Sequence, residues 1–146
     1  MLKKLILNTD GGARGNPGPA GIGVVIRNEQ NQIIAEHKQY IGEATNNVAE
    51  YKALILALAE GQKLLNVRGQ MSNVVSLEVR MDSELIVRQM QGQYKIKEPN
   101  LKLLAGEVLV LIKNFQQVIF RHVPREQNKE ADKLVNQAID EARGAS

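Results

Sequence analysis

The sequence predicts an α/β protein built on a mixed five-stranded sheet, in which a three-stranded antiparallel meander is joined by two further parallel strands, with helices on both faces. Two observations lead to this fold class. The first third of the chain holds three strand-like runs joined by short polar or glycine-rich links, which is typical of a meander. Beyond it, amphipathic segments with helical spacing alternate with two more strand-like runs, and strands joined through helices usually run parallel.

The meander begins with the apolar run Leu5 to Leu7, which is too short for a helix and is soon followed by breakers. We expect Asp10 where this strand gives way to a bend rich in glycine and proline, Gly11 to Gly21. The second strand follows as Ile22 to Arg27. After a polar turn, Gln32 to Ile41 returns as the third strand.

The later elements follow from two periodicities. Apolar residues at helical spacing predict helices, and strict alternation of apolar and polar residues predicts a strand with one buried face. The predicted order is helix, strand, helix, helix, strand, helix, over Thr45–Leu65, Val75–Asp82, Ser83–Met90, Pro99–Phe115, Val118–Val123 and Asn128–Ala142.

The composition is that of a globular protein. The chain has 146 residues, 43% of them hydrophobic, and no cysteine, so we expect one domain over residues 1–146 without disulfides, thiolate zinc sites or cysteine nucleophiles. No apolar run is long enough for a membrane span or a signal peptide, so we expect a cytoplasmic monomer that does not bind membranes. A formal charge of +3 permits a polyanionic partner without requiring one.

Four acidic residues occupy the ends of unrelated elements. Asp10 and Asp82 are expected at the carboxyl ends of parallel strands, where open α/β sheets bind ligands, and Glu50 and Asp132 lie near the starts of two helices. Each has an ordinary explanation as well. The two strand-end residues suit turns, the two helical residues suit the helix dipole, and Asn47 with Glu50 has the spacing of a capping box.

Taken together, the four acids favour a metal site. Carboxylates that converge repel one another and raise at least one pKa unless a cation lies between them. Mg²⁺ prefers oxygen ligands in octahedral geometry, and two such ions roughly 4 Å apart serve in-line phosphoryl displacement. No cluster of histidine and cysteine competes as a zinc site.

Four segments of the chain resemble the signature segments of the ribonuclease H type 1 family. They occur in the family's order and cover essentially the whole chain: TDGGARGNPGPAGIG, TNNVAEYKAL, MDSELIVRQMQG and HVPREQNKEADKL. The resemblance implies a ribonuclease H-like fold and places the family's metal-binding carboxylates on Asp10, Glu50, Asp82 and Asp132. It implies hydrolysis of the RNA strand of RNA/DNA hybrids with two Mg²⁺ ions, or Mn²⁺ as a substitute, leaving 5′-phosphate and 3′-hydroxyl ends.

The resemblance also implies contacts with the hybrid. Asn16, Asn46 and Asn47 match the positions that read the minor groove, and Asn16 and Thr45 match residues that seat a phosphate of the DNA strand. The ordinary explanations are turn chemistry for Asn16 and helix capping for Asn46 and Asn47. Arg14 is either a phosphate contact or a solvated loop charge.

Two departures from the better-known bacterial pattern bear on binding. Ser83 remains a candidate contact, but the glutamine that often follows it is replaced here by Glu84. The basic handle with interleaved tryptophans is absent, since Gln91 to Asn100 is short and the chain has no tryptophan. With few cationic contacts, we expect modest affinity for the hybrid.

His122 and Arg125, which both precede Asp132, are candidates for a role in proton transfer or product release. His122 lies ten residues upstream, a spacing that fits the loop histidine of many members, but its strand-like surroundings suit a structural residue equally well. Arg125 occurs in Pro124-Arg125-Glu126, a form found in a compact subgroup in which arginine takes the loop position. We favour Arg125.

Two alternatives stay open from the sequence. In the first alternative, the chain cleaves double-stranded RNA as well as hybrids. In the second, it is a non-catalytic domain that binds hybrids, although the presence of all four acids argues against this alternative. A nucleotide-phosphate loop within Gly11 to Gly21 is excluded, because no Gly-Lys-Ser/Thr follows it and no helix begins after the bend.

Overall fold

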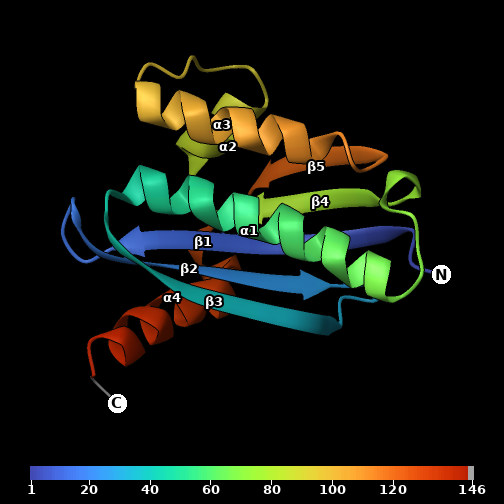
Figure 1. Ribbon diagram of the computed structural model, residues 1–146, viewed down its shortest axis with the longest axis horizontal. Helices are drawn as coiled ribbons and strands as arrows, with labels where there is room; N and C mark the ends of the chain where they lie inside the picture. Colours follow the sequence, from blue (N-terminus) through green and yellow to red (C-terminus); the bar gives the residue numbers. More distant parts are fainter. Residues whose placement is uncertain (145–146) are drawn as a thin grey trace.

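The computed structural model describes residues 1–144 (Figure 1). Its strands are β1 (Lys4–Ala13), β2 (Gly18–Arg27), β3 (Ile33–Ala44), β4 (Ser76–Met81) and β5 (Gln117–His122). Its helices are α1 (Asn46–Val67), α2 (Glu84–Met90), α3 (Pro99–Ile112) and α4 (Lys129–Ala142), with two short 3₁₀ turns, η1 (Ser72–Val74) and η2 (Arg125–Gln127).

The five strands form one mixed sheet in the order β3-β2-β1-β4-β5. The pairs β1–β2 and β2–β3 are antiparallel, whereas β1, β4 and β5 run parallel. Figure 1 shows α1 and α3 on one face of the sheet and α4 on the other. The predicted fold class, a meander plus two parallel strands with helices on both faces, is confirmed.

Most of the core lies between the sheet and α1. Apolar side chains of β1 and β4 pack there against Tyr51, Leu54 and Leu58, which are all fully buried. On the opposite face, a smaller cluster forms where Val25 of β2 meets Ala131 and Leu134 of α4. Among residues 1–144, no helix combines the length and apolar character that crossing a membrane requires.

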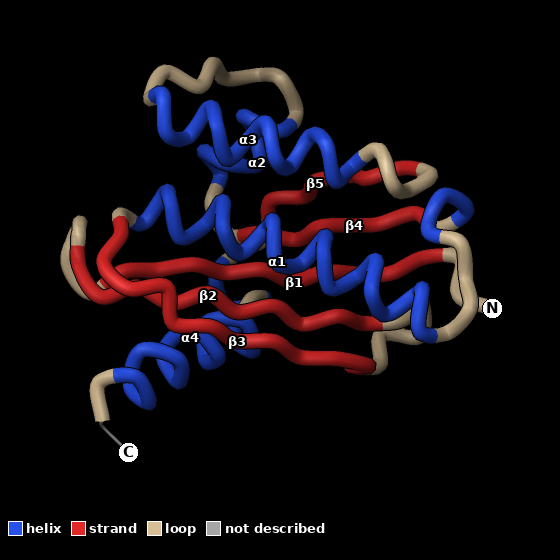
Figure 2. The backbone as a smooth tube through the Cα atoms, in the orientation of Figure 1, coloured by secondary structure: helices blue, strands red, loops and turns tan. Residues whose placement is uncertain are grey.

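The hairpin of β1 and β2 differs from the prediction. The bend expected over Gly11 to Gly21 is confined to the few residues between Ala13 and Gly18, and both strands continue through the glycines. Asp10 therefore lies within β1, paired with Gly23 of β2, and not at the point where the strand ends. Figure 2 shows the short turn beside the start of α1 at one end of the sheet.

Glycine occupies these strand positions because helices pack directly on the sheet there. A Cβ atom on Gly11 would lie 2.3 Å from the backbone carbonyl of Ala49 in α1. On the other face, a Cβ atom on Gly23 would lie 2.4 Å from the carbonyl oxygen of Ala131 in α4. The run of glycines that suggested a bend is therefore needed for the close approach of two helices to the sheet.

Replacing Gly11 with alanine tests this packing. We expect Gly11→Ala to lower the free energy of unfolding by about 1–3 kcal/mol or more, since α1 must move away from β1 to make room for the methyl group. Gly12→Ala is the matched control, because its Cβ would meet only a side-chain atom of Val135 at 3.7 Å, an ordinary contact. Chemical denaturation measures both variants, and equal stability of the two would contradict the packing argument.

Candidate active site

Four carboxylates meet just beyond the point where the parallel pairing of β1 with β4 ends. Asp10 in β1, Glu50 near the start of α1 and Asp82 directly after β4 each offer one carboxylate oxygen, and the three oxygens lie within 4.8 Å of one another. Asp132, in the first turn of α4, lies close enough to Asp10 to raise the pKa of that carboxyl. The structure thus brings together all four acids that the sequence singled out.

These acids line a cavity of about 450 Å³ that is open to solvent. The other polar side chains in its wall are Arg14, Asn46, Arg125 and Asn136. A cluster of this charge on a solvent-accessible wall can receive a cationic or metal-bridged ligand, whereas an apolar molecule would find few partners.

Burial and mutual repulsion raise the pKa values of Asp10, Glu50 and Asp82. The pKa of Asp10 rises to about 8, mainly because the side chain is buried, and further because Asp82 and Asp132 lie beside it. Burial likewise raises the pKa of Glu50 well above its usual range, with Asp10 and Asp82 adding to the effect. The pKa of Asp82 is also raised by burial, although Arg125 acts in the opposite direction.

This donor set fits a hard divalent cation. All the converging groups are carboxylates, which are the ligands that Mg²⁺ and Mn²⁺ take, and no histidine or cysteine joins the cluster in the described part of the chain. A cation between the oxygens would replace the protons that repulsion otherwise forces onto them. The raised pKa values and the short oxygen spacing therefore both support a metal site.

Local contacts around Glu50 correct one sequence-based interpretation. The N-cap of α1 is Thr45, whose Oγ1 accepts a 3.2 Å hydrogen bond from the backbone N–H of Val48. Asn47 is therefore not a cap, and Glu50 does not close a capping box with it. The Glu50 carboxylate accepts a 2.8 Å hydrogen bond from the backbone N–H of Gly11, which ties α1 to β1.

The expected nucleic-acid contacts fall into two groups. In the first, Asn16 Oδ1 accepts from the backbone N–H of Asn46 at 3.0 Å, and Asn46 Oδ1 accepts from that of Ala13 at 2.9 Å. These bonds join the β1–β2 turn to the start of α1 beside the acids. Arg14 also belongs here and is paired with Asp140 of α4 at 2.6 Å, so it is not a free loop charge.

The second group lies towards α2 and α3. Asn47 lines a separate cavity of about 540 Å³ together with Gln89 and Tyr94. Ser83 is the N-cap of α2, where its Oγ accepts from the backbone N–H of Ile86 at 3.3 Å. Capping is thus the structural role of Thr45 and Ser83 and not of the two asparagines at the start of α1.

Arg125 and His122 occupy different surroundings. Arg125 begins η2 and lines the same cavity as the acids, close enough to Asp82 to lower the pKa of that carboxyl. His122 is the last residue of β5, is exposed, and does not line the cavity. The structure therefore brings Arg125, and not His122, to the carboxylates.

Asn128 is a site residue that the sequence analysis treated only as the start of the last helix. It is 1% exposed, and its side chain lies against Asp82 and the backbone of Thr9 in β1. Its position four residues before Asp132, and the polar Asn8 directly after the apolar run Leu5 to Leu7, were the available signals. Neither signal shows that the two asparagines meet.

Comparison with known proteins identifies relatives along nearly the whole chain. A family model described as reverse transcriptase-like matches residues 8–138. The crystal structure of LC11-RNase H1 in complex with an RNA/DNA hybrid is similar, with 54% identity and a TM-score of 0.88 over 94% of this chain and 98% of that one. RNase H1 from the halophilic archaeon Halobacterium salinarum shares 37% identity and a TM-score of 0.84, over 94% and 98% of the two chains.

One curated relative is much longer than this chain. A bifunctional protein of Mycobacterium tuberculosis is 43% identical over 95% of this chain, but the match covers only 36% of that protein. The chain thus spans about a third of the length of this relative.

Removing one acid should change how stability depends on pH. The pKa of Asp10 rises from 3.8 to about 8, so the folded protein holds a proton that the unfolded chain releases. Between these values the free energy of unfolding falls as pH rises, and Asp10→Asn removes this loss. We expect the variant to match the wild type at the acid end and to exceed it increasingly towards pH 8 in metal-free buffer.

Thermal unfolding across this pH range, with a chelator present, measures the difference. Adding Mg²⁺ should narrow the gap, because the ion stabilises the wild type more than the variant. Stability curves that stay parallel at all pH values would contradict the raised pKa of Asp10.

Proposed function

Since this chain belongs to the ribonuclease H type 1 family, we propose that it is an endonuclease that hydrolyses the RNA strand of RNA/DNA hybrids and leaves 5′-phosphate and 3′-hydroxyl ends. The observation that carries the proposal is the convergence of Asp10, Glu50 and Asp82, with oxygens within 4.8 Å of one another, joined by Asp132. Phosphodiester hydrolysis needs positive charge at the phosphate, and this carboxylate cluster is arranged to hold the cations that supply that charge.

The four carboxylates would hold Mg²⁺ or Mn²⁺. When bound, such ions activate a water molecule and stabilise the leaving oxygen of an in-line displacement. Asp10 interacts with each of the other three acids and lies on β1, the central strand of the sheet, so we assign it the shared position. Glu50 is held towards it by the Gly11 N–H, and Arg125 adds a fixed positive charge on the Asp82 side.

The groups beside the acids suit recognition of a hybrid. In Asn16 and Asn46 the amide oxygens accept backbone hydrogen bonds, which leaves both NH₂ groups to donate to a ligand. Short amides can read 2′-hydroxyl groups, which only the RNA strand carries. The start of α1, capped by Thr45, favours a phosphate. We include three further residues among the proposed contacts: Asn47 in the first turn of α1, Ser83 directly after Asp82, and Arg14 in the wall of the cavity.

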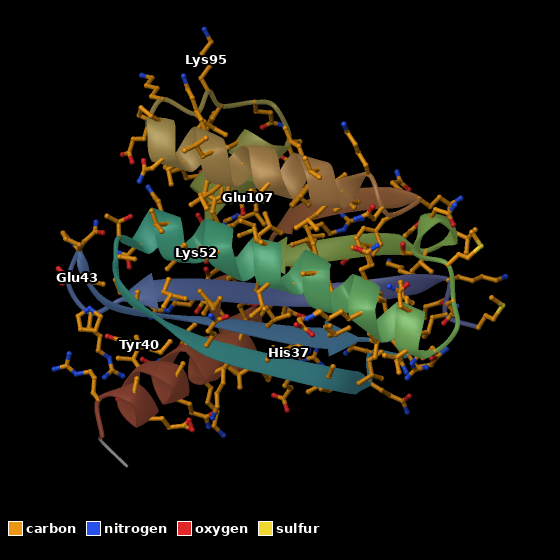
Figure 3. All side chains as sticks on the ribbon, viewed as in Figure 1. His37, Tyr40, Glu43, Lys52, Lys95 and Glu107 are labelled. Carbon is orange, nitrogen blue, oxygen red and sulfur yellow. The ribbon has the colours of Figure 1, made fainter. Side chains whose placement is uncertain are left out.

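The connection between α2 and α3 takes the place of the family's basic handle. It carries Lys95 and Lys97, and Figure 3 shows Lys95 projecting from it away from the sheet. Two lysines release few counterions, so binding to the hybrid should be modest and only moderately sensitive to salt.

Cleavage of end-labelled substrates tests the proposed activity. We expect the protein to cut the RNA of an RNA/DNA hybrid with Mg²⁺ or Mn²⁺, and to leave single-stranded RNA intact. Asp10→Asn and Asp82→Asn should abolish turnover while the proteins remain folded, because each removes a ligand of the cluster. Cleavage of double-stranded RNA in parallel reactions determines whether the activity extends to it. Binding of the hybrid without cleavage, or an active Asp10→Asn enzyme, would refute the proposal.

Arg125 and His122 are distinguished by their pH profiles. We expect Arg125→Ala to lower the rate about 10–100-fold, since it removes a positioned cation, and His122→Ala to change the rate little. Arginine stays charged throughout the working range, so Arg125→Ala should remove no inflection near neutral pH. His122→Ala should remove none either, because we assign this histidine no part in the reaction. Initial rates between pH 6 and 9 on folded protein provide the test. A profile that loses its inflection in His122→Ala, with Arg125→Ala nearly unchanged, would reverse the assignment.

A further inference from the structure

A fully buried amide joins three parts of the site. Asn128 lies between η2 and α4 and is 1% exposed. Its Nδ2 donates a 2.8 Å hydrogen bond to the backbone oxygen of Thr9, and its Oδ1 accepts a 3.1 Å bond from Nδ2 of Asn8. The same side chain lies close enough to the Asp82 carboxylate to lower the pKa of that group. Asn128 therefore ties the start of α4 to β1, the strand that carries Asp10, and lies beside the acid that follows β4.

The backbone of Asn128 holds two further site elements. Its carbonyl oxygen accepts from the N–H of Asp132 at 3.1 Å, and its own N–H donates to the carbonyl oxygen of Arg125 at 2.9 Å. The η2 turn thus ends, and the first turn of α4 begins, at this residue. Asp132 and Arg125 are placed by their distance along the backbone from an anchored amide.

The Asn128 side chain makes these contacts in place of the capping bond that is usual for asparagine at the start of a helix. Asparagine at an N-cap normally accepts a hydrogen bond from an N–H of the first helical turn. Asn128 occupies the N-cap of α4 but makes no side-chain capping bond. A residue that departs from its local preference while all its polar atoms are paired elsewhere marks a position set by tertiary demands.

A second chain of contacts reinforces the anchor. Asn8, which is 4% exposed, accepts a 3.4 Å hydrogen bond from Nε of Arg27, and Arg27 pairs with Glu130 in the first turn of α4 at 3.0 Å. The start of α4 is thus fixed to the sheet at Asn128 and again at Glu130. Such a network is needed because the four carboxylates repel one another and would otherwise separate.

We propose that Asn128 is a positioning residue that holds the first turn of α4, and with it Asp132, against β1, so that the acids are preset to receive divalent cations. The part of the inference that concerns cleavage rests on the proposed function, whereas the part that concerns metal affinity does not. Partners of metal ligands that are themselves not ligands typically alter affinity or activity about 10–100-fold.

Two variants of Asn128 test the inference. Asn128→Ala removes the amide. Asn128→Ser is too short to reach Thr9 and Asp82 but is itself a good N-cap, so it supports the start of α4. Asn114→Ala is the matched control, since it removes an asparagine side chain that donates to Gln62 at 3.0 Å, in the connection between α3 and β5 and away from the acids.

The measurements are Mn²⁺ titration calorimetry without substrate, steady-state cleavage of a hybrid, and thermal unfolding in chelator. For both Asn128 variants we expect Mn²⁺ affinity and kcat about 10–100-fold lower per folded molecule, with KM for the hybrid nearly unchanged. Asn114→Ala should lose stability alone.

The outcomes separate the two proposals. Asn128 variants that melt early but bind Mn²⁺ and turn over like the wild type would overturn the positioning role. A wild type that binds Mn²⁺ but cleaves no hybrid would refute the proposed function, and the calorimetric comparison would still decide the role of Asn128. Failure of the wild type to bind Mn²⁺ would overturn both.

Discussion

The repulsion among four convergent carboxylates is the constraint on which the rest of this structure depends. Asp10, Glu50, Asp82 and Asp132 arrive on separate elements, so no local segment can hold them together. The raised pKa values of Asp10, Glu50 and Asp82 indicate that the fold brings the acids together at the expense of stability, and protons or cations must offset the charge. Sites of this kind are stable only when a rigid scaffold surrounds them, and the fully buried core beneath α1 provides that scaffold.

The neighbours of the acids divide the work of holding them. A backbone N–H at Gly11 fixes Glu50, and the Arg125 guanidinium offsets part of the charge on Asp82. The buried amide of Asn128, which is bonded to the backbone of β1, also lowers the pKa of Asp82. These three contacts differ in chemistry but act in the same direction, since each gives a carboxylate a partner before any cation binds. The cluster is thereby preorganised, which lowers the cost of assembling it around a phosphate.

Close packing of helices on the sheet sets the scale of the site. Glycines at positions 11 and 23 let α1 and α4 approach β1 and β2 from opposite faces, to distances that any side chain would prevent. Glu50 and Asp132 are carried by these two helices, so the separation of the acids depends on the absence of two Cβ atoms. These two glycines thus control the geometry of the acid cluster through sterics, without contributing a side chain to it.

Residue spacing predicts the fold class, the element order and the four acids, because burial periodicity and strand polarity are local properties. Tertiary contacts were needed to show that the glycines of β1 and β2 belong to strands, that Thr45 and not Asn47 caps α1, and that Arg125 reaches the cavity. They also fix the orientation of Asn128, whose partner Asn8 is 120 residues away along the chain. Hydrogen-bond partners and close approaches depend on what arrives from distant segments, and no local pattern encodes that arrival.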